Sequence, residues 1–126
     1  MLFRSDMRNV SGMVLKDREK LSTDGAIICG VVLDFKSKKV IGGPDIQSRG
    51  VIYLKDADHI LTEIGNILIS TIERNVEEGT YENMQVRMEA RDQISRYVMK
   101  STGKAPMILP AIVEIDLGEE SGKENQ

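Results

Sequence analysis

The sequence contains very few of the side chains that metal and thiol chemistry require. Its 126 residues include one His (His59), one Cys (Cys29) and no Trp. A Cys/His zinc cluster needs several such ligands and cannot be assembled within this chain. A Cys/His nucleophile pair would have to join two residues from unrelated contexts. We therefore expect no metal, no cofactor and no catalytic residue in this chain. A single Cys also fits a reducing, cytoplasmic compartment.

Long apolar runs and aromatic side chains are scarce as well. No run approaches the roughly 20 apolar residues of a membrane-spanning helix, and residues 1–12 lack the apolar segment of a signal peptide. Aromatic residues make up 4% of the chain, too few for a surface that stacks nucleic-acid bases. We expect a cytoplasmic domain without a membrane partner.

The net charge of −3 is unevenly distributed. Residues 1–55 carry ten basic and six acidic groups, whereas residues 56–126 carry seven basic and fourteen acidic groups. Any contact with nucleic acid must therefore be local.

The first half of the chain predicts short strands. Residues 26–35 alternate between two apolar faces, and a polar turn at 36–38 leads into a second strand at 39–41. Residues 42–50, GGPDIQSRG, contain three Gly and one Pro and predict a shaped loop before a third strand at 51–54. The larger of the two faces of the first strand comprises Ile27, Cys29, Val31, Leu33 and Phe35.

The second half predicts two helices and a late strand. A first helix begins near Asp56 and ends at Gly79, and its apolar residues recur every four positions. A second helix runs from about residue 82 to 101, followed by a strand at 107–115 in which Pro110 favours an edge position or a bulge. The apolar stripe of the first helix is Ile60, Ile64, Leu68, Ile72 and Val76. The predicted buried side of the second is Met84, Met88, Ala90, Ile94, Tyr97 and Val98.

The order β-β-β-α-α-β predicts an α+β fold, a small mixed sheet packed on one face by two helices. Residues 13–117 would form the domain, with a linker or lead-in at 1–12 and a disordered tail at 118–126. Two helices cover only one face of a sheet, so the other should pack against a second subunit or domain. The interface candidates are Ala26, Ile28, Val32, Pro110 and Ile112.

Two groups of residues could contact an anion or RNA. In the 42–50 loop, Ser48, Arg49 and the glycine amides could hold a phosphate or carboxylate. Alternatively, Asp45 and Ser48 cap the loop's own amides while Arg49 pairs with an acid. On the second helix, Arg87 and Arg91 are four residues apart, as are Arg96 and Lys100. They could contact RNA phosphates or form a solvated helix face, with Asp92 pairing with Arg96.

Several separated motifs resemble the C-terminal domain of bacterial ribonuclease J, over about residues 10–116. They are Gly12–Arg18, Leu21–Gly25, the strand Ile27–Asp34, Gly43–Gly50 with Val51–Tyr53, Arg91–Tyr97 and Pro106–Pro110. Together they are specific, although each alone is weak.

The resemblance implies a cytoplasmic 5′-to-3′ exoribonuclease and endoribonuclease of the metallo-β-lactamase/β-CASP family, whose zinc ions lie in a preceding catalytic domain. This domain would then be a non-catalytic accessory part that supports homodimerisation and docking to the catalytic domain. The alternative is a module that guides single-stranded RNA to the nuclease. No His-x-His-x-Asp-His run is present, so no metal ligand is carried over to this chain.

Overall fold

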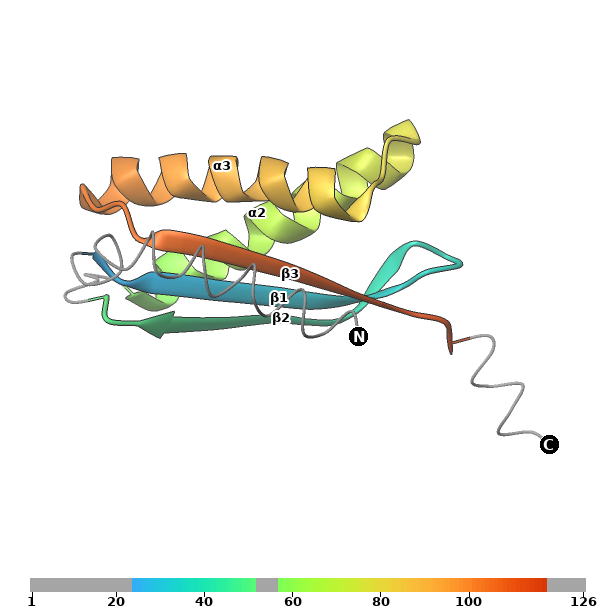
Figure 1. Cartoon of the computed structure of the whole chain (residues 1–126), viewed down its shortest axis with the longest axis horizontal. Coiled ribbons are helices and arrows are strands. Elements are labelled where there is room, and N and C mark those ends of the chain that lie inside the picture. The colour runs from blue at the N-terminus through green and yellow to red at the C-terminus, as the bar shows by residue number, and fades with distance from the viewer. Residues whose placement is uncertain (1–23, 52–56, 118–126) are drawn as a thin grey trace, which may run out of the picture.

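The structure, a computed structural model, describes residues 24–51 and 57–117. Three strands and two helices follow one another in the order β-β-α-α-β (Figure 1). The strands are β1 (Ala26–Asp34), β2 (Lys39–Arg49) and β3 (Met107–Ile115), and the helices are α2 (Ala57–Glu78) and α3 (Asn83–Thr102). The predicted α+β fold is confirmed. The predicted third strand at 51–54 lies largely outside the described residues, and Val51 itself is in no strand.

The sheet is mixed, with strand order β2-β1-β3. β1 pairs with β2 as an antiparallel hairpin and with β3 in parallel. A parallel neighbour requires a crossover, and the two helices supply it. β3 is an edge strand of the described sheet, which confirms the edge position predicted from Pro110.

The prediction of a loop at 42–50 is wrong, because strand β2 continues through these residues to Arg49. Asp45, Ile46 and Gln47 pair with Gly30, Cys29 and Ile28 of β1, and the register shifts between Gly30 and Val32. Strand pairing uses backbone groups, so a glycine-rich segment can belong to a strand. The register shift accommodates the glycines whose backbone conformation differs from that of a regular strand. Gly43 has φ +85°, and the Gly43–Pro44 peptide bond is cis.

The hairpin turn covers Phe35 to Lys38, as the polar residues 36–38 predicted. The side chain of Asp34 stabilises it by accepting hydrogen bonds from the Ser37 amide and hydroxyl at 3.2 and 2.6 Å. The prediction that Phe35 belongs to the buried face is wrong, since its side chain is 50% exposed. The strand ends at Asp34, so its alternation no longer applies to Phe35.

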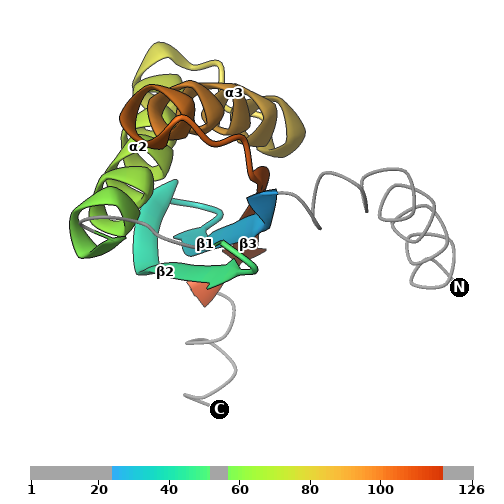
Figure 2. The same cartoon turned by 90° about the vertical axis from the view of Figure 1, so that its left-hand side faces the viewer.

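Both helices cover the same face of the sheet, as the end-on view shows (Figure 2). The core lies between these layers and contains the predicted apolar residues of β1 and α2, apart from Val76, which is partly buried against it. Its fully buried members include Ile27, Cys29, Leu33, Ile64, Leu68, Ile72, Val86, Ala90, Ile94 and Val98. Of the part of the chain that the structure describes, no helix is long and apolar enough to cross a membrane.

Helix α3 buries part of the side that the sequence predicted, with Ala90, Ile94 and Val98 in the core and Tyr97 packed against it. Met84 and Met88 are 57% and 47% exposed, and Val86 lies in the core instead. The apolar residues of α3 are spread around most of the helix, so periodicity alone did not fix its orientation.

The ends of α3 follow capping rules. The Glu82 carboxylate accepts hydrogen bonds from the amides of Met84 and Gln85 at the N-terminus. At the C-terminus Gly103 adopts φ +73°. Helix α2 ends the same way, with Gly79 at φ +73°. The predicted stop signals are therefore confirmed.

Candidate docking face and charged surfaces

The face of the sheet turned away from the helices is apolar along β1 and β3, and we call it the open face. On β2, Gln47 and Asp45 pair with Ile28 and Gly30 and add polar groups to this face. In the parallel register Ile28 lies beside Leu109 and Val32 beside Val113. Ile28 and Leu109 are each 39% exposed, and Val113 is 54% exposed. Both described helices, α2 and α3, lie on the opposite side of the sheet (Figure 2). Because large apolar side chains gather here on adjacent strands, the open face is suited to packing against another protein surface.

The structure places only some of the five interface candidates on this face. Ile28 and Val32 lie on it, whereas Ile112 pairs with Val31, is 8% exposed and belongs to the core beneath the helices. Ala26 is 6% exposed. Ile112 is therefore corrected to a core residue, whereas Ala26 shares the alternation of Ile28 and Val32 but has little exposed surface. The sequence analysis missed Leu109 and Val113, which the alternation in residues 107–115 could have identified.

Pro110 lies where a partner strand would otherwise pair. The Met107 amide donates to the Gly25 carbonyl, and the Ile115 carbonyl accepts from the Phe35 amide, so these odd-numbered residues direct their backbone groups toward β1. In a parallel strand the intervening residues direct theirs the other way. The position of Pro110 therefore faces the free edge, where proline supplies no N–H group.

Side chains from the start of α3 cover part of the same edge. The Asn83 amide donates to the Ile112 carbonyl at 3.0 Å and to the Glu114 carboxylate at 3.1 Å. The Tyr81 hydroxyl donates to the same carboxylate. Burial, followed by the hydrogen bond and negative charge of Glu114, raises the pKa of Tyr81. Together these contacts hold the α2–α3 connection against the end of β3 and occupy an edge acceptor.

The anion-site candidates Ser48 and Arg49 lie at the end of β2. Ser48 pairs with Ile27 of β1, and the Arg49 guanidinium donates to the Ser48 carbonyl at 3.0 Å and to the Gln47 side chain at 3.2 Å. No ion pair joins Arg49 to an acid within residues 24–51 and 57–117. Within residues 24–51 and 57–117 the structure shows neither amide capping by the Asp45 and Ser48 side chains nor an acid partner for Arg49, and the segment instead pairs with β1.

The cations of α3 form two separate pairs. Arg87 and Arg96 are nine residues apart, which is two and a half turns of an α-helix, so their pairs lie on opposite flanks. The Arg87 guanidinium donates a hydrogen bond to the Asn83 side chain at 2.6 Å, and Asn83 in turn donates to the Ile112 carbonyl of β3. On the other flank, Glu89 contacts Arg74 and Asn75 of α2. Arg87 and Arg91 therefore do not share a surface with Arg96 and Lys100.

The expected pairing of Asp92 with Arg96 is replaced by another. The Asp92 carboxylate lies 3.5 Å from the guanidinium of its neighbour Arg91. Both side chains are largely exposed, so this contact contributes little to stability.

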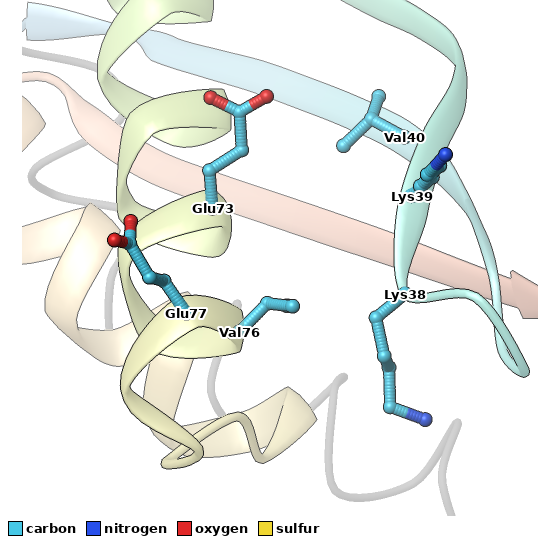
Figure 3. Close-up of a pocket in the computed structure, with 6 residues that line it drawn as sticks. All are labelled: Lys38, Lys39, Val40, Glu73, Val76 and Glu77. Atoms are coloured by element: carbon cyan, nitrogen blue, oxygen red, sulfur yellow. The ribbon is translucent and has the colours of Figure 1, made fainter.

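A cleft of about 390 Å³ separates the hairpin turn from α2 (Figure 3). Two Lys residues line one wall and two Glu residues line the other, with Val40 and Val76 between them. The Lys38 ammonium lies 3.6 Å from the centre of the Phe35 ring and donates to the Phe35 carbonyl. This lysine is therefore engaged with its own turn. The lining residues are Lys38, Lys39, Val40, Glu73, Val76 and Glu77.

The two residues singled out for metal or thiol chemistry lie apart. Cys29 is fully buried in the core, and burial raises its pKa to about 11. His59 is exposed near the start of α2. Within residues 24–51 and 57–117, no three His, Cys, Asp or Glu side chains form a group that could hold a metal ion.

The fold and its surfaces define a small α+β domain in which two helices cover one side of a mixed sheet and the other side is apolar along β1 and β3. Residues 13–115 match the family described as the ribonuclease J C-terminal domain. The chain belongs to this family, which confirms the resemblance drawn from its motifs.

Two staphylococcal proteins illustrate the relationship. The chain is 37% identical over 107 residues to ribonuclease J 2 of Staphylococcus epidermidis strain ATCC 35984 and to ribonuclease J 2 of Staphylococcus aureus strain NCTC 8325. In each case the match covers 85% of this chain and 19% of the relative. The chain thus spans about a fifth of the length of the relatives it matches.

Proposed function

We propose that this chain is the non-catalytic accessory domain of a ribonuclease J, and that its open face docks a second subunit or a neighbouring domain. The parent would be a cytoplasmic, zinc-dependent ribonuclease with exo- and endonuclease activity, acting in RNA processing and decay. Zinc would belong to its catalytic domain, and this chain itself would bind no cofactor.

The observation that supports docking is the side-by-side placement of Ile28 with Leu109 and Val32 with Val113. Because Ile28, Leu109 and Val113 are 39–54% exposed, covering the rest of each side chain would contribute roughly 0.5–1.5 kcal/mol. Burial of this face therefore favours association, provided that the partner surface is complementary. Pro110 and Asn83 obstruct strand addition at the neighbouring edge, so we expect contact through the face.

The parent enzyme provides the direct test. Removing the segment that corresponds to residues 13–117 should reduce its assembly, measured as solution mass by sedimentation, and its processive RNA decay. Unchanged mass and unchanged decay in the truncated enzyme would overturn the proposal.

A finer test uses substitutions in the intact parent. Ile28→Asp with Val113→Asp places two charges on the open face and should weaken assembly at least tenfold. Phe35→Asp is the matched control, because Phe35 is also an exposed apolar residue but lies in the hairpin turn. Equal weakening by the control would show that the open face has no specific role.

RNA guidance is the alternative function, and the placement of the cations limits it. Because the two pairs lie on opposite flanks of α3, a single strand of RNA cannot follow all four side chains along one straight path. Salt-sensitive RNA binding by the isolated chain, weakened by Arg87→Glu with Arg91→Glu, would support this alternative over docking.

A further inference from the structure

Helix α3 is apolar on two sides, and only one of them faces the core. The second side carries Met84, Met88 and Met99, which are 57%, 47% and 47% exposed. Met88 follows Met84 by four residues and Met99 follows Met88 by eleven, close to three turns, so the three lie along one stripe, in which Asp92 and Ser95 separate Met88 from Met99. We call this stripe, with Arg87 and Arg91 beside it, the methionine flank.

The charge beside the three methionines is mainly positive. Arg91 is seven residues after Met84, which places it close to the line of the stripe. The hydrogen bond to Asn83 holds Arg87 near the start of the helix. Asp92 is the acid that pairs with Arg91, through a largely exposed contact of 3.5 Å. A complementary surface would therefore combine apolar side chains with carboxylates.

We propose that the methionine flank docks an amphipathic, acidic helix of another protein. Aliphatic side chains of that helix would cover the three methionines, and its carboxylates would meet Arg87 and Arg91. Methionine is unbranched and adapts to irregular partner surfaces. Pairing of an apolar helical face with an apolar stripe is an established mode of peptide recognition. This surface is in the helical layer, so the inference does not depend on the open face.

Other occupants fit the methionine flank less well. A second copy of the flank would bring its own arginines toward Arg87 and Arg91, and like charges oppose such pairing. RNA could use the arginines, but thioether side chains offer no planar surface for bases to stack on. An acidic helix satisfies both the apolar and the cationic parts.

The test uses the full 126-residue chain, labelled with ¹³C in its methionine methyl groups. The probes are two synthetic helices of about 20 residues, the length of α3, with the same leucine stripe and either Glu or Lys on the flanking positions. The Glu helix should shift the methyl signals of Met84, Met88 and Met99 and bind at least tenfold more tightly than the Lys helix. Equal binding of both probes, or shifts confined to other methionines, would overturn the proposal.

Four variants test whether binding depends on the methionine flank or only on the net charge of the chain. Arg91→Glu should weaken binding of the Glu helix about fivefold, and Met84→Gln with Met88→Gln about tenfold. Arg49→Glu makes the same charge change at the end of β2, on another element, and should leave the affinity within twofold. Equal loss in Arg91→Glu and Arg49→Glu would overturn the proposal, as would loss caused by Ile28→Asp on the open face. Circular dichroism confirms that each variant is folded before its affinity is compared.

Discussion

Gly65 of α2 lies directly against Pro44 of β2. A Cβ atom at position 65 would lie 2.7 Å from Pro44 Cγ and 3.1 Å from Pro44 Cβ, closer than carbon atoms normally approach. Gly65 is buried, and Pro44 belongs to the irregular part of the edge strand. The contact shows why a glycine is tolerated in the middle of α2: it lets the helix approach β2.

Gly65→Ala should therefore destabilise the domain. Alanine favours a helix by about 1 kcal/mol over glycine, but overpacking against a proline ring costs about 1–3 kcal/mol. We expect a net loss of about 1 kcal/mol in the free energy of unfolding, measured by urea denaturation. Ser70→Ala, at an exposed site in the same helix, is the control and should be neutral or slightly stabilising. A Gly65→Ala variant more stable than the wild type would contradict this interpretation.

The sequence was sufficient to predict the elements whose side chains define a face. The repeat of Ile60, Ile64, Leu68 and Ile72 predicted α2 and its buried side, and glycines marked the ends of both helices. In β2 the prediction failed because Gly42 to Gly50 reads as a loop, whereas the backbone still pairs with β1. Pairing partners are tertiary information that a local pattern does not contain.

The surfaces were harder to predict than the elements. The alternation in residues 26–35 identified the open face from Ile28 and Val32, but Ile112 was assigned to it although its own alternation places it in the core. Met84 and Met88 were assigned to the core although they lie on the surface. In an amphipathic helix, the local pattern predicts that hydrophobic residues are buried. Where such a residue instead lies outside the stripe that packs against the sheet, the prediction fails, and such positions are candidates for function.

Pro110→Val should make the free edge of β3 competent for pairing. The substitution restores an N–H group that points away from β1, so it costs no hydrogen bond within the sheet. We expect faster aggregation on warming, followed by light scattering. Leu109→Val is the control, because the backbone groups of residue 109 point toward β1 and the change adds no donor to the edge. Identical aggregation rates for Pro110→Val and the wild type would show that the edge is protected by other means.

Tyr81→Phe should change the dependence of stability on pH at the alkaline end. Burial and the neighbouring Glu114 raise the pKa of Tyr81 above its usual value of about 10. The folded state therefore holds the phenolic proton more tightly than the unfolded state. This contribution is fully present below about pH 10 and is lost as pH rises toward the folded pKa. Urea denaturation from neutral pH to about pH 11 should show a shallower decline in Tyr81→Phe.

Two further observations check this assignment. Below about pH 10 the variant should lose about 0.5–1.5 kcal/mol, the usual value of one hydrogen bond. Tyr97→Phe is the control, because it removes a phenol elsewhere in the domain. It should leave the slope of unfolding free energy against pH as in the wild type. If both variants give the same slope, the contact between Tyr81 and Glu114 is not the cause.

Cys29 should report global unfolding of the domain. It is the only thiol in the chain, its side chain is fully buried between the sheet and the helices, and burial raises its pKa to about 11. Thiolate is the reactive form, so both access and ionisation oppose modification of the folded state. At neutral pH, reaction with a disulfide reagent should be slow in buffer and should accelerate with urea in parallel with loss of helical circular dichroism. The fully denatured chain should react rapidly with one equivalent. Rapid stoichiometric reaction in buffer would instead show that β1 opens locally, and would place the strand at the centre of the sheet among the least stable parts of the fold.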